Sequence, residues 1–266
     1  MDEHKVTIQT LRAMKQRGEK VAALTAYDFF TAKIMDEVSV HLILVGDSLG
    51  MAVLGYENTL SVTMEEMIHH TKAVARAKPN ALLVADMPFM TYSNLELALK
   101  NAAQFIQVGA EAVKIEGGEA VVEQVRALVA AGIPVLGHIG LLPQAILETG
   151  GYKIQGRTSE SAEGLIRDAK LLEEAGVFAI VIECVVADVA KRITTAAKVP
   201  TIGIGAGSGC DGQILVSNDM LGQFTWFTPK HVKRYANLAE EMRKAFVAYR
   251  REVESGQFPG KEQSFS

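Results

Sequence analysis

Short apolar segments rich in β-branched residues recur eight times along the chain, and longer segments with helical periodicity separate most of them. Strands buried on both faces of a parallel sheet show such nearly continuous hydrophobic runs. The expected strands are Val21–Tyr27, Leu42–Asp47, Leu82–Met87, Ala112–Glu116, Pro134–His138, Phe178–Glu183, Thr201–Ala206 and Gln213–Val216. Eight strands in strict β-α order predict an α/β fold, a closed (β/α)8 TIM barrel with a helical shell. A doubly wound open sheet is the alternative.

The segments between the strands carry the signals of amphipathic helices. The expected helices are Thr63–Lys78, Asn94–Val108, Glu119–Ala131, Ser159–Ala175 and Asp188–Lys198, and Thr63 with Glu66 forms a capping-box pattern. An extra N-terminal helix, Thr7–Gly18, is suited to closing the lower end of the barrel. We expect residues 1–266 to form a single barrel domain with a polar C-terminal tail from about residue 251.

Composition narrows the class of partner. The chain has 266 residues with a net charge of −4, and a (β/α)8 barrel typically needs about 250. The acidic balance argues against nucleic acid as the main partner. The most apolar segment, Phe178–Ala190, is shorter than the roughly 20 residues of a membrane span. No secretory signal is visible, and Cys184 and Cys210 suggest no disulfide framework. We therefore expect a cytoplasmic protein that does not bind membranes.

Charged residues gather at the carboxyl ends of neighbouring strands, where barrel enzymes build their sites. Asp47, Asp86 and Glu116 come at or near the ends of the second, third and fourth strands. Lys114 and Glu116 are two residues apart, so both should face the barrel axis. Glu183 ends the sixth strand on the same face as apolar neighbours, which suits it to act as a base. The long irregular segment after the fifth strand, Gly140–Thr158, is expected to be functional.

Three converging carboxylates indicate a hard divalent cation. With oxygen ligands and no paired histidines or cysteines, Asp47, Asp86 and Glu116 favour Mg²⁺ or Mn²⁺. The alternative is a structural ion-pair network in which Lys114 neutralises the carboxylates. A 2-oxo acid chelated by the cation would have its carbonyl polarised and its neighbouring carbon acidified. Glu183 would then accept the proton, and Lys114 would neutralise the substrate carboxylate or the enolate oxygen.

Seven blocks of sequence resemble the ketopantoate hydroxymethyltransferase (3-methyl-2-oxobutanoate hydroxymethyltransferase) family, and the resemblance runs from about Thr7 to Arg250. The blocks are Thr25–Asp28, Val45–Met51, Ala85–Phe89, Val113–Gly118, Gly137–Gln144 and Gly203–Gly207 with Cys210–Gln213. The resemblance implies a barrel of the phosphoenolpyruvate-binding type. It also implies transfer of a hydroxymethyl group from 5,10-methylenetetrahydrofolate to 3-methyl-2-oxobutanoate, which gives 2-dehydropantoate for pantothenate synthesis.

The resemblance also assigns roles to residues. It implies that Asp47, Asp86 and Glu116 hold one Mg²⁺ and that Asp47, Ser48, Asp86 and Lys114 bind the oxo acid. Glu183 matches the proton acceptor of the family. Members of the family form large homo-oligomers, often decamers, so a homo-oligomer is expected.

Two other functions remain open. A Mg²⁺-dependent oxo-acid lyase or mutase of the isocitrate lyase and phosphoenolpyruvate mutase group would share the barrel and the enolate chemistry. Such enzymes carry a catalytic cysteine segment resembling Lys-Lys-Cys-Gly-His, and this chain has no such run. The second alternative is a non-catalytic barrel that senses oxo acids, which would not need the base Glu183.

Four further features have a structural and a functional interpretation. His138 is either a substrate contact or a hydrogen-bonded structural histidine. Asp28 is expected to cap a helix, and Gly203–Gly207 to allow close packing or folate access rather than to bind phosphate. Trp226 is expected in the core or at a subunit interface. Cys184 has no histidine near it in sequence that would support a nucleophile.

Overall fold

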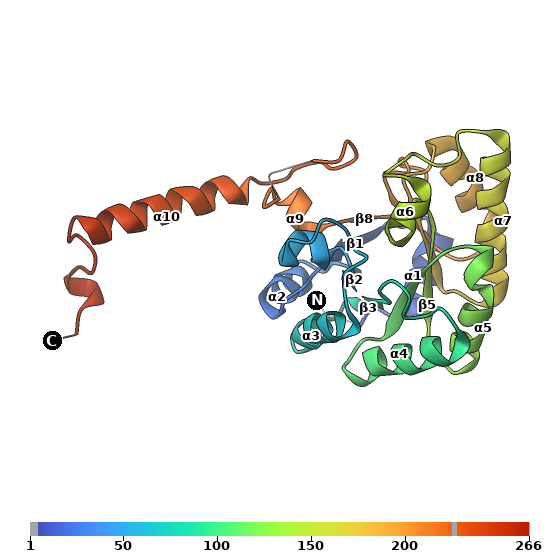
Figure 1. The fold of residues 1–266 in the computed structure, drawn as a ribbon, viewed down its shortest axis with the longest axis horizontal. Helices are drawn as coiled ribbons and strands as arrows, with labels where there is room; N and C mark the ends of the chain where they lie inside the picture. The colour runs from blue at the N-terminus through green and yellow to red at the C-terminus, as the bar shows by residue number, and fades with distance from the viewer. Residues whose placement is uncertain (1–4, 225–227, 266) are drawn as a thin grey trace. The chain divides into compact units, whose positions relative to one another are not determined.

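Eight parallel strands close into a barrel in the computed structural model, which describes residues 5–224 and 228–265 (Figure 1). The strands pair in sequence order, and β1 closes the barrel against β8. Their bounds are β1 Val21–Thr25, β2 Leu42–Val45, β3 Leu82–Asp86, β4 Ala112–Glu116, β5 Val135–Gly140, β6 Ala179–Glu183, β7 Thr201–Ile204 and β8 Gly212–Leu215. The predicted (β/α)8 barrel is confirmed, and each strand lies within two residues of its expected start.

Helices follow most strands, as the periodicity predicts. They are α1 Ile8–Arg17, α2 Phe29–Glu37, α3 Met64–Ala75, α4 Leu95–Gln107, α5 Val122–Ala130, α6 Ile146–Thr149, α7 Ser159–Ala175, α8 Ala187–Ala196, α9 Ser217–Met220 and α10 Leu238–Glu254. Single turns occur at η1 Gly50–Leu54, η2 Glu119–Val121, η3 Pro143–Ala145 and η4 Lys261–Gln263.

The predicted strict β-α order is wrong at one connection. Residues 205–211, which join β7 to β8, contain no helix. Gly207 has a φ of 77°, and a Cβ there would lie 2.7 Å from the Cβ of Ala187. Gly203 in β7 is also closely packed, since a Cβ there would lie 3.0 Å from the sulfur of Cys210. These glycines therefore serve close packing of a short turn.

The strands have two apolar faces, which build two separate cores. Outward side chains such as Val113 and Ile115 pack with the helices in the larger core, whereas Ala112, Ala179 and Val181 belong to a smaller core inside the barrel. The alternation of side chains along a strand produces this division. Lys114 and Glu116 lie on the inner face of β4, as predicted.

The N-terminal helix α1 plugs the amino-terminal end of the barrel. Leu11 and Met14 belong to the inner core together with Val21 and Leu42, which begin their strands. The helix starts at a capping box formed by Thr7 and Thr10 and ends at Gly18 in a left-handed conformation. Apolar side chains of α1 thus fill the lower end of the barrel, and the carboxylates of Asp47, Asp86 and Glu116 lie toward the opposite mouth.

The chain divides into two compact units, residues 1–216 and residues 217–266. The first is the barrel. The second contains α9, α10 and η4, and the predicted polar tail from about residue 251 begins inside α10. Exposed apolar side chains on α10 include Met242, Phe246 and Tyr249. Trp226 lies outside the described residues.

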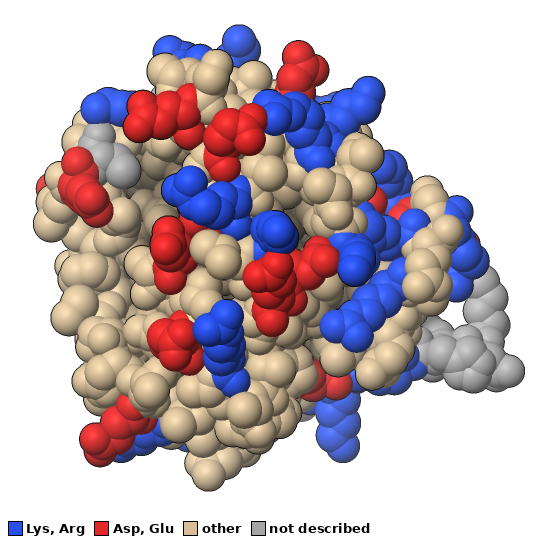
Figure 2. Space-filling model, turned by 90° about the vertical axis from the view of Figure 1, so that its right-hand side faces the viewer, with Lys and Arg blue, Asp and Glu red and all other residues tan. Residues whose placement is uncertain are grey.

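The outer surface beside α7 has mixed charge. Figure 2 views the side of the molecule where α7 lies in Figure 1, and acidic and basic side chains are interspersed there. Arg192 on α8 forms an exposed ion pair with Glu163 on α7, and Lys170 forms one with Glu174 within α7. Such pairs contribute little stability each. None of the described helices combines the length and the apolar composition that crossing a membrane requires.

Candidate active site

The register of the barrel sets the predicted site residues side by side. Asp86 on β3 is the Cα partner of Lys114 on β4, and Glu116 is the partner of His138 on β5. Asp47 lies two residues after the end of β2, and its backbone N–H donates a hydrogen bond of 3.3 Å to Oδ2 of Asp86. Neighbouring strands therefore bring these side chains to one sector of the mouth.

Asp47, Asp86 and Glu116 converge closely enough to share one cation. One carboxylate oxygen from each lies within 4.8 Å of the other two. All three residues are almost completely buried, with exposed fractions of 3%, 1% and 4%. An all-carboxylate donor set is the type that hard divalent cations prefer. The donor chemistry of this cluster fits the predicted metal site.

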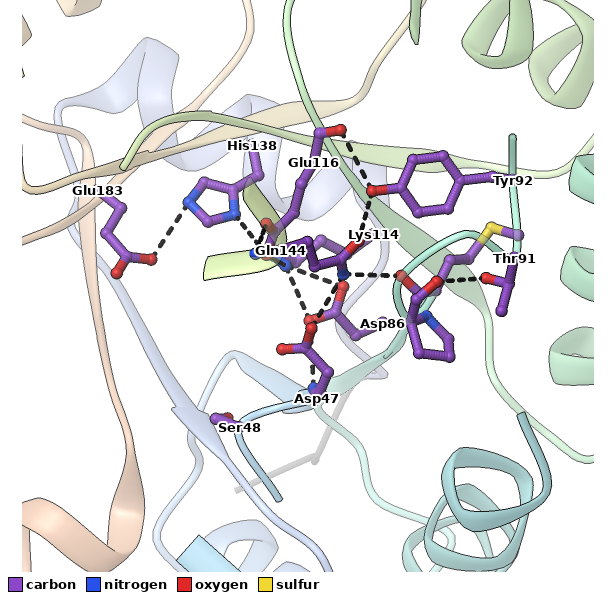
Figure 3. Close-up of polar contacts among 12 residues, drawn as sticks. Asp47, Ser48, Asp86, Thr91, Tyr92, Lys114, Glu116, His138, Gln144 and Glu183 are labelled. Atoms are coloured by element: carbon purple, nitrogen blue, oxygen red, sulfur yellow. Dashed lines mark hydrogen bonds and ion pairs between the residues drawn. The ribbon is translucent and has the colours of Figure 1, made fainter. Parts of the chain in front are cut away.

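Lys114 lies inside the carboxylate cluster and is itself buried. Its ammonium group is 2.8 Å from both carboxylate oxygens of Asp86 and 2.9 Å from Oε1 of Glu116 (Figure 3). Burial by itself would lower the pKa of Lys114, but the charges of Asp86, Glu116 and Asp47 outweigh burial and hold that pKa well above its usual value. Lys114 is therefore a fixed cation, and the ion-pair network considered as an alternative exists.

One lysine does not neutralise three carboxylates, and the pKa values of the acids reflect this. Burial and the charges of Asp86 and Glu116 hold the pKa of Asp47 well above its usual range. Burial also raises the pKa of Asp86, although Lys114 opposes the shift. Burial would likewise raise the pKa of Glu116, but Lys114 and His138 outweigh it and lower that pKa to about 2. Asp47 is therefore the member of the triad whose ionised form is most disfavoured, and a bound cation would stabilise that form.

His138 connects the carboxylate cluster to Glu183. Its Nδ1 is 3.3 Å from Oε1 of Glu116 and its Nε2 is 3.2 Å from Oε2 of Glu183 (Figure 3). Among the described residues, neither contact has the angles of a hydrogen bond. Burial and Lys114 each lower the pKa of His138, but Glu116 and Glu183 outweigh them and raise it to about 9. A protonated His138 therefore separates the two acids, and Glu183 lies outside the carboxylate triad.

Gln144 is a site residue that the sequence did not single out. Its Nε2 donates to Oδ2 of Asp47 at 2.9 Å and to the carbonyl of Met87 at 3.0 Å. Its backbone N–H donates to Oε2 of Glu116 at 3.1 Å, and Tyr92 Oη donates to Gln144 Oε1 at 2.6 Å. The orientation of the side-chain amide is thereby fixed. Gln144 therefore donates hydrogen bonds to two members of the triad, Asp47 and Glu116.

The loop after β5 carries Gln144 back over the mouth of the barrel. Gly140 has a φ of 101°, and a Cβ there would lie 2.2 Å from the carbonyl oxygen of Glu183. Only glycine allows so close an approach, and it lets Leu141 N–H donate to that carbonyl at 2.8 Å. The segment 140–158, expected to be irregular and functional, contains η3 and α6, and η3 positions Gln144.

The remaining predicted residues occupy separate positions. Ser48 lies beside Asp47, but its hydroxyl is 2.9 Å from Tyr27 Oη. Asp28 caps α2 by accepting from Thr31 N–H, as predicted. Cys184 is partly buried, and burial with the charge of Glu183 raises its pKa to about 11. Tyr92 was not foreseen because nothing in its local sequence links it to the strands that form the site.

One family of known proteins matches nearly the whole of this chain. The family model described as ketopantoate hydroxymethyltransferase matches residues 5–261. A protein from Clostridium novyi (strain NT) is 57% identical over 263 residues, which is 98% of this chain and 96% of that protein. A protein from Syntrophus aciditrophicus (strain SB) is 54% identical, over 98% of this chain and 97% of its own. Both are named 3-methyl-2-oxobutanoate hydroxymethyltransferase.

Solved structures share the fold at low sequence identity. Phosphonopyruvate hydrolase, solved with oxalate and Mg²⁺, is 18% identical with a TM-score of 0.62, over 97% of this chain and 91% of that chain. A 2,3-dimethylmalate lyase of the phosphoenolpyruvate mutase and isocitrate lyase superfamily is 16% identical with the same TM-score and coverage. These likenesses support the (β/α)8 barrel fold that the sequence predicts. The match over residues 5–261 and the identities above 50% show that this chain belongs to the ketopantoate hydroxymethyltransferase family.

Proposed function

We propose that this enzyme transfers a hydroxymethyl group from 5,10-methylenetetrahydrofolate to 3-methyl-2-oxobutanoate, giving 2-dehydropantoate for pantothenate and coenzyme A synthesis. The names of its relatives support the proposal. The observation that carries it is the buried triad of Asp47, Asp86 and Glu116, with one oxygen of each within 4.8 Å of the others. A cluster of this charge at the mouth of a barrel suits chemistry in which negative charge develops on a chelated substrate.

Asp47, Asp86 and Glu116 are the residues that would hold Mg²⁺. When bound, the cation supplies Lewis-acid polarisation of a substrate carbonyl and neutralises charge. The donor set supports Mg²⁺ over softer ions, since all three groups are carboxylates. The raised pKa of Asp47 further supports a cation, because an extra positive charge would stabilise its ionised form.

The residues around the triad take the remaining roles. Lys114 is a buried cation that can neutralise the carboxylate of the oxo acid or the enolate oxygen. Asp47, Ser48 and Asp86 complete the oxo-acid site. Glu183 is proposed to accept the C3 proton, and its Oε2 lies 3.2 Å from His138 Nε2. A side chain that is 17% exposed can meet substrate at the mouth and still be oriented by its neighbour.

The atoms of the overall reaction balance with one water. The C3–H bond breaks, its proton goes to Glu183, and the electron pair enters the enolate. A new bond joins C3 to the one-carbon unit, and the bonds from that carbon to the two carrier nitrogens break. Water supplies the hydroxyl group and one proton, and this proton and the C3 proton accepted by Glu183 end on the two nitrogens. Tetrahydrofolate is the second product.

The direct test supplies the purified enzyme with Mg²⁺, 3-methyl-2-oxobutanoate and 5,10-methylenetetrahydrofolate. We expect 2-dehydropantoate and tetrahydrofolate in equal amounts, and a chelator should stop their formation. Cleavage or rearrangement of an oxo acid without folate would instead place the enzyme with the lyases and mutases. Oxo-acid binding with no turnover would indicate the non-catalytic sensor.

We also propose a homo-oligomer, a decamer by family resemblance, acting in the cytoplasm. Support for self-association comes from α10, where Met242, Phe246, Tyr249 and Val253 are exposed at alternating spacings of four and three residues. This spacing is typical of helices that pack against one another. Support for a reducing compartment comes from Cys184 and Cys210, which are both free thiols.

A further inference from the structure

A cavity of about 270 Å³ opens beside the carboxylate cluster and shares two residues with it. Glu116 and Gln144 form part of its wall, so the cavity borders the site at which the oxo acid is proposed to bind. The rest of its lining comes from the β3–α4 segment, from η2 and the start of α5, and from the β5 loop. A second reactant held in this cavity would border the triad at Glu116.

The wall formed by the β3–α4 segment is apolar and held in a fixed shape. Phe89 and Met90 line the cavity, yet they are 40% and 58% exposed. Met90 has a φ of 65°, a conformation that costs free energy for a residue other than glycine and recurs at functional sites. The turn is stabilised by Thr91, whose hydroxyl donates to the carbonyl of Pro88 at 2.6 Å, and by Asn101, whose Nδ2 donates to the carbonyl of Thr91 at 2.7 Å.

Tyr92 and Gln124 add polar groups to a cavity that Ser93, Glu116 and Gln144 also line. Tyr92 presents its ring to the cavity, while its hydroxyl is committed to Gln144. In the part of the chain that the structure describes, no hydrogen bond engages the side chain of Gln124. Ligand sites typically combine apolar and aromatic walls with a few polar groups that orient the ligand. A flat ring with hydrogen-bonding groups on its edge matches these walls.

We infer that this cavity seats the reduced pterin ring of the folate carrier, with its edge on Gln124 and its one-carbon unit directed at the triad. The inference rests on the proposed function. A volume near the lower end of the range for small-molecule sites, about 300–1,000 Å³, accommodates a bicyclic ring but not the whole carrier. The aminobenzoyl-glutamate tail therefore extends past the exposed Phe89 and Met90 into solvent.

A competing occupant is the isopropyl group of the oxo acid, because it too must lie near the triad. The isopropyl group is far smaller than the cavity, and it has no donor or acceptor that could hydrogen-bond to the amide of Gln124. The two occupants predict opposite effects on the two substrates, so kinetics can separate them.

The test fills the cavity from an exposed position. Ala120 in η2 lines the cavity and is exposed, so a larger side chain can be introduced without disturbing the core. Ala120→Trp is compared with Ala130→Trp, which adds the same side chain at the exposed far end of α5. We expect Ala120→Trp to raise the KM for 5,10-methylenetetrahydrofolate at least ten-fold and the KM for the oxo acid less than two-fold, with Ala130→Trp like the wild type.

Binding of tetrahydrofolate, measured by calorimetry with Mg²⁺ present, tests the cavity without turnover. Ala120→Trp should weaken this binding at least ten-fold and Gln124→Ala several-fold. If Ala120→Trp fails to fold, Gln124→Ala still tests whether the cavity binds tetrahydrofolate. Unchanged tetrahydrofolate binding in both variants, or a rise in the KM for the oxo acid alone, would overturn the inference. If the wild type bound tetrahydrofolate but formed no 2-dehydropantoate, the proposed function would fail instead.

Discussion

Gln144 links the backbone of a loop to the side chains that are proposed to bind Mg²⁺. It donates to Asp47 from its side chain and to Glu116 from its backbone, and Tyr92 fixes the direction of its amide. Groups that hydrogen-bond to metal ligands orient them and tune their affinity. Gln144 therefore acts through the carboxylates as a positioning residue.

Gln144→Leu should weaken Mg²⁺ binding about 10- to 100-fold, because Asp47 loses the donor that orients it. Tyr92→Phe is the matched control, since it removes only the hydroxyl that orients the amide and should cost less. Isothermal titration calorimetry with Mg²⁺ measures both. Equal affinity in the wild type and Gln144→Leu would show that Gln144 does not position the triad.

Cys184 gives a prediction about pH. Because burial and the charge of Glu183 raise the pKa of this thiol to about 11, only a small fraction is thiolate near pH 8. For a thiol with the ordinary cysteine pKa of about 8.5, the ratio of thiolate to neutral thiol at the same pH would be more than 100-fold larger. Iodoacetamide should therefore label Cys184 slowly at pH 8, and the rate should rise with pH up to about 11. Mass spectrometry of the peptide that contains Cys184 measures the extent of labelling. Rapid labelling at pH 8 would contradict the raised pKa of this thiol.

At the scale of elements, the strands and the inward direction of their charges could be predicted. Unbroken apolar runs define parallel strands, and the two-residue period places Lys114 and Glu116 on the axis. The β7–β8 connection departs from the strict β-α order, and the expected bounds of its two strands already leave only residues 207–212 between them. The position of Gln144 was hidden, since it follows from the turn at Gly140 over Glu183. Long-range packing decides this position.

The helix α1 has a testable share in the stability of the barrel. Leu11 is completely buried in the inner core, so Leu11→Ala leaves a cavity and should lower the free energy of unfolding by about 2–5 kcal/mol. The neighbouring Arg12 is exposed, and Arg12→Ala should change the free energy of unfolding by less than about 0.5 kcal/mol. Urea unfolding followed by circular dichroism measures the difference. Equal stability of the two variants would contradict the role of α1 as a plug.

At the scale of the whole molecule, the proposed oligomer depends on α10. Phe246→Asp puts a charge on the exposed apolar face, whereas Lys244→Asp puts the same charge at a position already polar. We expect Phe246→Asp to lower the mass measured by light scattering and Lys244→Asp to leave it unchanged. The same oligomer in both variants would show that α10 is not the interface.

The central claim is that the triad and Glu183 together make an enolate of the oxo acid. Nuclear magnetic resonance tests it most directly, by following exchange of the C3 proton of 3-methyl-2-oxobutanoate with deuterium in D₂O without folate. We predict exchange by the wild type with Mg²⁺ and none after chelation. Glu183→Gln should abolish exchange while still binding Mg²⁺ and the oxo acid, because the triad is intact. Full exchange by Glu183→Gln, or by the wild type without a divalent cation, would contradict the account.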